Sequence, residues 1–470
     1  VVAKVGLIRI LATVSTMALL GLFVLALPAL AAEPSISPIT LLAAGDMRGE
    51  INPCGCSPEG QLGGLPRRLT YLDEHFGEDP QPLLVDLGNN FPEPSAQGDL
   101  KVQLIQRLLR FSKPVAILPG PNELALGVET LSPELPWLIS NNALVRNNAP
   151  IANDALNPLF QPLVVVSRVD QRIGFFGYLS PEGIYQGSQK NFALLPLSEQ
   201  MLADWRAVIQ REELHQTVLL FRGSAEEAAL IAEAQLFDVV LSGNPFADEL
   251  NQVLQRQAGA QIWPQVPTKG QGVVRLTLAA SSSQTLATSS KATPPRAAPR
   301  QGPPLGQVDW LSERYADHAE ALHAFAEYDE AVKQLFFARL ATMEQAKQHS
   351  PFVGGAVCAG CHVAAQAVWS GSRHKGALAT LVRVGKQFDP ECLACHVVGY
   401  EREGFLSEDL TPHLPNVQCE NCHGPARAHL TDTRVPPGPP PGVPSEAKSN
   451  TVPHPTAQSM VAGSKRVPGE

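Results

Sequence analysis

The sequence predicts an α/β domain followed by a second, mainly α domain. Across residues 33–280, short apolar runs alternate with amphipathic stretches, which is typical of strands covered on both faces by helices. Between residues 358 and 423, three copies of C-x-x-C-H occur, the spacing at which two thiols and a histidine attach c-type haem. The second domain is therefore expected to pack around haem. With 470 residues, 44% of them hydrophobic, the chain is long enough for both domains.

Charge and composition narrow the classes of function. The chain has 36 basic and 45 acidic side chains, a net charge of −9, which argues against a nucleic-acid partner. Its 42 prolines predict that part of the chain is linker or tail. Eight cysteines are too few for a disulfide-dense miniprotein.

Residues 1–32 have the pattern of a Sec-type signal peptide. Lys4 and Arg9 precede an apolar run from about Ile10 to Leu27, and the A-x-A cleavage pattern Ala29–Ala31 follows. The run is near the lower length limit for a membrane span, so an uncleaved anchor is the alternative. We therefore expect a periplasmic or otherwise exported protein, which is bound to a membrane only if this segment is not cleaved.

Apolar runs within residues 33–280 mark the expected strands. They lie at 39–46, 82–88, 114–120, 162–169, 172–179, 217–223 and 238–244. Helix-like segments at 99–111 and 196–214 lie between some of them.

Three further segments complete the predicted organisation. Residues 281–306 are rich in Ser and Pro and read as a flexible linker. Residues 307–432 combine a helical segment with the haem-binding region; apolar side chains recur at helical spacing over 308–347, as one helix, two helices or only a spacer. Residues 433–470 are Pro-rich, lack apolar periodicity, and read as a disordered tail.

The three C-x-x-C-H motifs predict three c-type haems. Chance predicts about 0.003 copies of this motif in a chain with eight cysteines and 12 histidines. Zinc ribbons also use C-x-x-C pairs, but they do not require a His directly after the second Cys. In c-type haem sites the two thiols bond to the haem vinyl groups, and the adjacent His binds the iron. The expected attachment residues are Cys358, Cys361, His362, Cys392, Cys395, His396, Cys419, Cys422 and His423.

Residues 352–432 resemble the cytochrome c-554 family of multihaem electron carriers. The resemblance rests on WSGSRHKGA (369–377), CLACHVVGY and VQCENCHGPARAHL around the haem motifs. It implies that His374 and His429 are distal iron ligands. The family usually has a fourth C-x-x-C-H downstream, which this sequence lacks.

The first domain resembles the calcineurin-like metallophosphoesterases, closest to exported 5′-nucleotidases and related thiosulfate-cleaving enzymes. The resemblance runs through GDMRGEINP, LLVDLGNNF, LPGPNELALG and FDVVLSGNPF. It implies a dimetal site, but most ligands are replaced: Asp46 remains, while Arg48, Asn89, Pro121-Asn122, Asn244 and Phe246 stand at metal-binding positions. One Asp beside an Arg cannot offset two dications, so we expect a metal-free relic; a site built from other ligands is the alternative.

Cys54 and Cys56 form a C-x-C pair just after the first strand, at the end where α/β domains place their pockets. They could be a structural disulfide or a functional dithiol. Arg48, Arg67 and Arg68 lie nearby in sequence and could lower the thiol pKa values or hold a small anion.

Together these features favour an exported multihaem c-type cytochrome that exchanges electrons with periplasmic redox partner proteins. The degenerate domain would then serve for docking or ligand binding. One alternative is a redox enzyme acting on a sulfur or nitrogen compound at the Cys54/Cys56 loop. The other is an active nucleotidase with an accessory cytochrome.

Overall fold

The computed structural model describes most of the chain between Pro38 and Pro437. The described ranges are 38–53, 61–78, 81–146, 149–150, 158–168, 171–183, 192–243, 256–258, 261–278, 306–343 and 350–437. The predicted signal peptide, most of the linker, the Cys54/Cys56 pair and all but the first residues of the predicted tail lie outside them.

The chain divides into two compact units. The first comprises residues up to Asp46, Tyr71–Asn89 and Lys113–Leu311. The second comprises Met47–Thr70, Asn90–Ser112 and the chain from Ser312 onward. Two segments of the predicted α/β region therefore group with the haem motifs, which sequence proximity alone does not indicate.

A five-stranded mixed sheet forms one half of the first unit, in the order β14-β13-β1-β2-β3. Strands β1 (Ile39–Ala44), β2 (Leu83–Asp86) and β3 (Ala116–Ile117) are parallel. Strand β13 (Gly272–Leu278) runs antiparallel to β1, and β14 (Gly306–Trp310) runs antiparallel to β13. The central strands are buried almost throughout, as expected for uninterrupted apolar runs.

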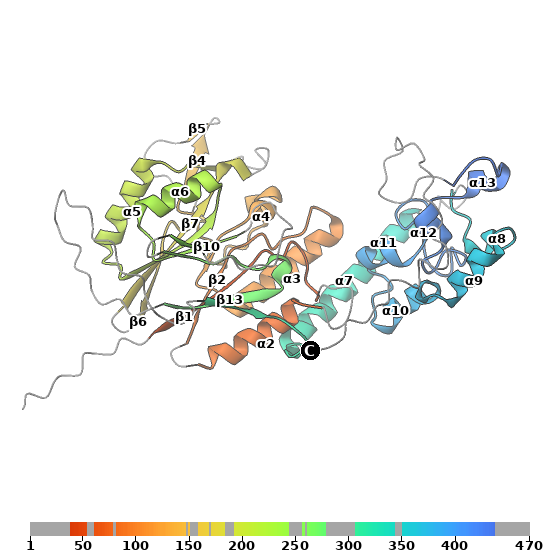
Figure 1. The fold of residues 1–470 in the computed structure, drawn as a ribbon, viewed down its shortest axis with the longest axis horizontal. Helices are drawn as coiled ribbons and strands as arrows, with labels where there is room; N and C mark the ends of the chain where they lie inside the picture. The colour runs from red at the N-terminus through yellow and green to blue at the C-terminus, as the bar shows by residue number, and fades with distance from the viewer. Residues whose placement is uncertain are drawn as a thin grey trace, which may run out of the picture. The chain divides into compact units, whose positions relative to one another are not determined.

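A six-stranded mixed sheet forms the other half, in the order β11-β12-β10-β9-β7-β6. Figure 1 labels β6, β7 and β10 of this sheet. Its strands are β6 (Val164–Arg168), β7 (Gln171–Leu179), β9 (Gln216–Arg222), β10 (Val239–Ser242), β11 (Arg256–Ala258) and β12 (Gln261–Trp263). Helices α5 (Glu199–Arg211) and α6 (Ala225–Ala234) contribute Leu202, Trp205 and Ile231 to a core shared with the aromatic side chains of β7 and β9.

Smaller elements complete this part of the chain. They are α2 (Leu65–Phe76), α4 (Pro121–Ala125), the 3₁₀ helices Val128–Thr130, Pro181–Gly183 and Thr268–Gly270, and the three-stranded sheet of β5 (Ala149–Pro150), β4 (Asn142–Arg146) and β8 (Phe192–Leu194).

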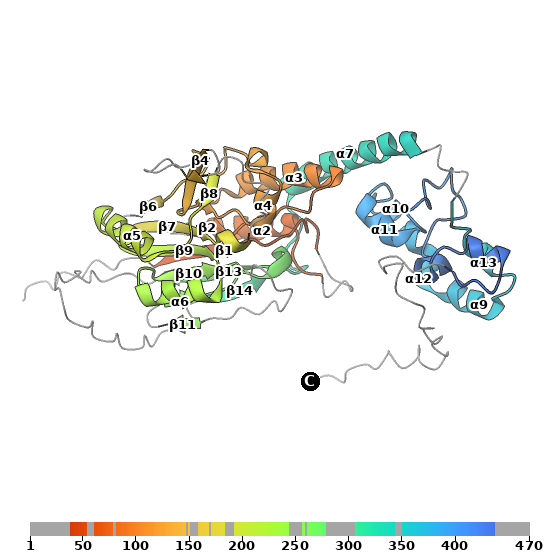
Figure 2. The same cartoon turned by 90° about the horizontal axis from the view of Figure 1, so that it is seen from above.

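The second unit is helical in its described residues. Helices α3 (Ala96–Ser112) and α7 (Ala319–Met343) pack against each other. The short helices are α8 (Gly355–Cys358), α9 (Val363–Gly371), α10 (Ala377–Arg383), α11 (Pro390–His396), α12 (Cys419–His423) and α13 (Arg427–Thr431), and Figure 2 shows α9 to α13 as one group. Phe336 of α7 joins Leu378, Leu381, Leu393 and others in a core at this end.

The structure confirms the predicted fold class, an α/β region with mixed sheets and a mainly α region that contains the haem motifs. One prediction is wrong in detail. Residues 306–310 are not the start of a helical segment but form β14, with Val308 opposite Val274, and the helix begins only at Ala319. The alternation of Val308 and Trp310 with polar residues suits a sheet edge. Within the described residues, no helix is both long and apolar enough to cross a bilayer.

Candidate haem attachment sites

Each C-x-x-C-H motif is built on a short helix or its end. Helix α8 ends at Cys358, and a turn continues to His362, whose N–H donates to the Cys358 carbonyl over 2.9 Å. Helices α11 and α12 end at His396 and His423. Residues three and four apart share a helix face, so the second and third motifs present two thiols and an imidazole on one side.

The six described cysteines are suited to covalent attachment because none is in a disulfide. In each motif the first cysteine is half-buried and the second is exposed. Burial raises the pKa of the Cys392 thiol to about 12 and that of Cys358 to about 11, which keeps both in the thiol form at neutral pH. A deeper sulfur and an outer sulfur could fix the two vinyl groups of one porphyrin.

Local signals fix where these helices begin. Asp389 is the N-cap of α11, where its carboxylate accepts from the Glu391 N–H, and Pro390 follows at the first helical position. Gln418 and Asn421 form a reciprocal capping pair at α12. The helix starts therefore place the first cysteine of the second and third motifs close to a capped N-terminus.

Two histidines are oriented by backbone carbonyls. His396 Nδ1 lies 2.8 Å from the Ala377 carbonyl oxygen, and His429 Nδ1 lies 2.7 Å from that of Val435. Because a carbonyl only accepts, each Nδ1 carries the proton and leaves Nε2 as the lone-pair donor. This arrangement is the one that metal-binding histidines commonly adopt.

His362 and His429 face each other as a pair. Their ring centroids lie 6.3 Å apart, with 31° between the ring planes. Two imidazoles on one metal ion hold their ring centres about 6 Å apart, because each metal–nitrogen bond is about 2.0 Å. A separation of 6.3 Å between the ring centroids is therefore compatible with one metal ion bound by both histidines.

The other predicted distal ligand, His374, lies on the 3₁₀ helix Arg373–Gly376. Its side chain is exposed, and its N–H donates to the Ser372 hydroxyl. Its role as a ligand stays a prediction.

The buried carboxylate of Glu420 links the segments around the first and third motifs. Helices α8 and α12, which carry Cys358 and Cys419, contact each other. Glu420, between the cysteines of the third motif, is buried, and its carboxylate accepts from the N–H groups of Val353, Gly354 and Ala426 at 2.7–3.1 Å. Sequence reasoning missed Glu420, since a glutamate at this variable position is ordinarily solvated.

Apolar side chains near the motifs are exposed in a pattern that haem would cover. Val357, Val363, Val368 and Leu430 flank the first motif and the helix of His429, and all are more than 40% exposed. Exposed apolar side chains beside an attachment motif are suited to contact a bound porphyrin. The thiols, the imidazoles and these side chains together fit covalent haem.

A buried ion pair lies among the described residues where the resemblance implies a dimetal site. Asp46, at the end of β1, accepts from the Asn89 amide over 2.7 Å and pairs with Arg222 at 3.6 Å. Arg222, at the end of β9, also donates to the Leu87 and Gly88 carbonyls. Asp46 and Asn89 both have a positive φ, 53° and 57°, a strained conformation often found at functional sites.

Arg222 was not among the predicted site residues. The signal that could have found it is a charged residue ending the apolar run TVLLFR in a strand that is otherwise buried. Among the described residues, no three His, Cys, Asp or Glu side chains gather as a metal centre. Asn244 and Phe246 lie outside those residues.

The predicted anion-binding arginines lie near the start of α2. Arg68 is buried and contacts the Met47 sulfur at 4.0 Å, while Arg67 is half-buried and donates to the Gln61 carbonyl. Arg48 is half-buried with φ of 52°. Cys54 and Cys56 are outside the described residues, so their role with these arginines stays a prediction.

Comparison with known proteins supports the haem region. Residues 357–424, which include all three motifs, match the family model "Cytochrome c554 and c-prime". Cytochrome c-554 of Nitrosomonas europaea is 32% identical over 101 residues, which are 18% of this chain and 43% of that protein. The match to a c-type cytochrome domain implies covalently bound c-type haem. The chain spans less than half the length of this curated relative.

Similar solved structures include phosphoesterases of the kind that the sequence motifs predicted. A 5′-nucleotidase precursor from Thermus thermophilus is 17% identical, with 63% of this chain and 59% of that chain covered and a TM-score of 0.47. The sulfate thiohydrolase SoxB of Thermus thermophilus is 13% identical, with 69% and 64% covered and a TM-score of 0.47. The calcineurin-like phosphoesterase YfkN of Bacillus subtilis is 15% identical, with 63% and 97% covered and a TM-score of 0.45.

Proposed function

We propose that the protein is an exported electron carrier with three covalently attached c-type haems and an α/β part that is not an active phosphoesterase. The observation that carries this proposal is the repeated site: three motifs, each with two thiols outside any disulfide and an adjacent histidine, at the end of a short helix or in the turn that follows it. The family match over the same residues supports it. Bound haem supplies a one-electron iron couple whose potential depends on axial ligands, burial and nearby charge.

In this proposal the chain's own residues attach and orient each haem. The cysteine pairs at 358/361, 392/395 and 419/422 form the thioether bonds, and His362, His396 and His423 are the proximal ligands. The Ala377 carbonyl holds His396 with Nε2 free and increases its basicity by accepting from Nδ1.

His429 is proposed as the distal ligand of the first haem, opposite His362. The 6.3 Å separation of the two rings and the carbonyl contact at His429 Nδ1 support this assignment. His374 is proposed as the distal ligand of another haem, on the family resemblance alone.

The contact between helices α8 and α12 also bears on electron transfer. Because these helices carry Cys358 and Cys419, haems attached at the first and third motifs would lie near each other. We therefore propose that the first and third haems exchange electrons directly.

Haem stoichiometry tests the proposal. A pyridine haemochrome assay on the exported protein should give three haems per chain. The double variant Cys392→Ser/Cys395→Ser should lose one haem, whereas the control Cys54→Ser/Cys56→Ser should keep all three. A wild-type count of none, one or two would overturn the proposal.

Spin state tests the axial ligands. His429→Ala should convert one haem from low-spin to high-spin, as followed by electron paramagnetic resonance, with haem content unchanged. His413→Ala removes a nearby exposed imidazole and is the matched control. An unchanged spectrum of His429→Ala would remove His429 from the ligand set.

Export to the periplasm and redox partner proteins there are part of the same proposal. N-terminal sequencing of the mature protein should locate the cleavage site. The α/β part is proposed to dock a partner or bind a small anion, and the buried Asp46–Arg222 pair supports a role without metals. A redox role for Cys54 and Cys56 stays open, and haem reduction by thiol donors in their double Ser variant tests it.

A further inference from the structure

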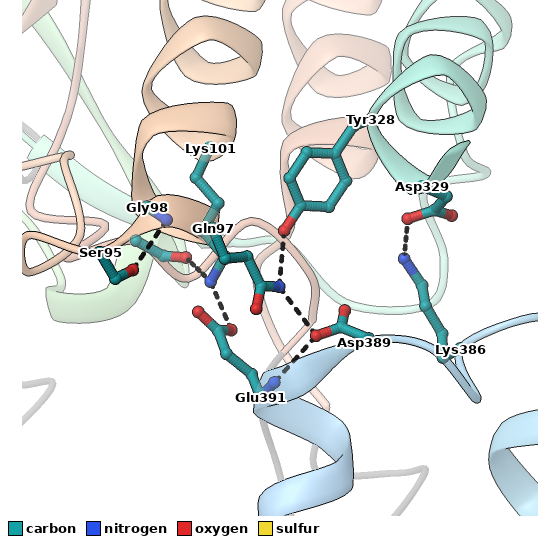
Figure 3. A network of polar contacts seen from close by, with 10 residues as sticks. Ser95, Gln97, Gly98, Lys101, Tyr328, Asp329, Lys386, Asp389 and Glu391 are labelled. Carbon is teal, nitrogen blue, oxygen red and sulfur yellow. Dashed lines mark hydrogen bonds and ion pairs between the residues drawn. The ribbon is translucent and has the colours of Figure 1, made fainter. Parts of the chain in front are cut away.

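A polar network joins α3 and α7 to the segment that precedes the second haem motif (Figure 3). Gln97 and Lys101, one turn apart on α3, contact Asp389 and Glu391 at the start of α11. These four residues belong to the same compact unit. Helix α3 thus contacts the helix that carries Cys392, Cys395 and His396.

Lys101 is the central cation of this network. Its side chain is only 8% exposed, and its Nζ lies 2.6 Å from Glu391 Oε2 and 2.9 Å from the Gly49 carbonyl oxygen. Glu391 is 54% exposed and immediately precedes Cys392. A buried ammonium held by one carboxylate is costly to leave unpaired, so the contact fixes the start of α11.

Gln97 supports the same helix start. Its Nε2 donates to Asp389 Oδ1 over 2.8 Å and to the Tyr328 hydroxyl over 3.0 Å. Asp389 is buried and caps α11. Lys386 pairs with Asp329 of α7 on the other side of Tyr328.

Charges of this network act at the attachment sulfur. After burial, the largest influences on the pKa of the Cys392 thiol are the charges of Asp389, which raises it, Lys386, which lowers it, and Glu391, which raises it. The electrostatic potential at the anchor of the second haem therefore depends on how these carboxylates are neutralised.

We infer that Lys101 is a positioning residue that sets the reduction potential of the haem attached at Cys392 and Cys395. This inference rests on the proposed attachment of haem at the second motif. Lys101 neutralises Glu391 beside the attachment sulfur, and loss of that cation leaves a negative charge that stabilises the ferric state. Helix α3, which belongs to the predicted α/β region of the sequence, thereby influences the reduction potential of one of the three haems.

A pair of opposite substitutions tests this inference by spectroelectrochemical titration of the purified, haem-loaded protein. Lys101→Met should shift one of the three redox components to lower potential and leave two unchanged. Glu391→Gln should shift the same component to higher potential. The double variant should return close to wild type, and Lys101→Arg should retain the wild-type potential.

Arg107→Met is the matched control. Arg107 also lies on α3 and pairs with Glu327 of α7 at 2.5 Å, so its loss weakens the same helix pair without touching the haem motif. No component should shift. The inference is overturned if Lys101→Met leaves all components unchanged, or if Lys101→Met and Glu391→Gln shift a component in the same direction.

Haem content separates this inference from the proposed function. A wild-type protein without three haems contradicts the proposed function. Three haems with no opposite shifts contradict only the role of Lys101. If Lys101→Met does not fold, Glu391→Gln decides the question. It should raise the reduction potential of one component, whereas Glu401→Gln, which removes a more distant carboxylate, should leave all components unchanged.

Discussion

Replacing Arg222 by Met should strongly destabilise the α/β part of the protein. Both partners of the Arg222–Asp46 pair are almost inaccessible, 1% and 0% exposed. Removing the guanidinium leaves the buried Asp46 carboxylate with the Asn89 amide as a hydrogen-bond donor and without the Arg222 cation. The Leu87 and Gly88 carbonyls also lose the hydrogen bonds that Arg222 donates to them.

The expected loss can be estimated from these contacts. Breaking a buried ion pair by removing one partner costs about 3–5 kcal/mol. For a domain of this size, each kcal/mol lowers the unfolding midpoint by roughly 2–4 °C, so the midpoint should fall by about 6–20 °C. Asp46→Asn/Arg222→Met should lose less than Arg222→Met, because it removes the uncompensated charge as well.

Thermal unfolding followed by far-UV circular dichroism, with haem absorbance as a second probe, measures this effect. Arg172→Met is the control, because Arg172 pairs with Glu212 at 3.2 Å at a partly exposed position of the same sheet and should cost under about 1 kcal/mol. A loss below about 1 kcal/mol for Arg222→Met would refute the reasoning. So would a fall in the wild-type midpoint on adding EDTA, because it would indicate a bound metal.

Two further predictions concern other buried groups. Glu420→Gln should destabilise the haem region by about 2–3 kcal/mol, because an amide cannot accept three N–H bonds as a carboxylate does. Thermal unfolding of the haem region measures this loss, and Glu401→Gln, at an exposed position, is the control. Equal unfolding midpoints for the two variants would contradict the prediction. Burial raises the pKa of Tyr400 to about 12 and also raises those of Tyr178 and Tyr328. Since these phenols titrate near 10 when unfolded, their contribution to stability should be complete below pH 10 and should fall as pH rises towards 12. The chain has six tyrosines, so ionisation of more than three of them near pH 10 without unfolding, measured by tyrosinate absorbance, would contradict this.

The strands and the haem motifs were the parts most accessible from sequence. Apolar runs such as 82–88 and 172–179 contain or closely match β2 and β7, because burial on both faces demands continuous apolar sequence. Arg222 and Glu420 were not predicted, because charged residues are ordinarily exposed and only the tertiary structure shows the partners that compensate their burial. The Lys101–Glu391 contact joins residues far apart in sequence, and no local pattern indicates it.

Strand β14 has a consequence for how the protein can be divided in the laboratory. It pairs with β13 after the Ser/Pro-rich stretch, so that stretch connects two neighbouring strands of one sheet. A fragment ending near residue 280 would expose the backbone N–H and C=O groups of β13, and such unpaired edges promote association between copies. Expression fragments of the α/β part should therefore extend through Leu311, so that β14 covers this edge of the sheet.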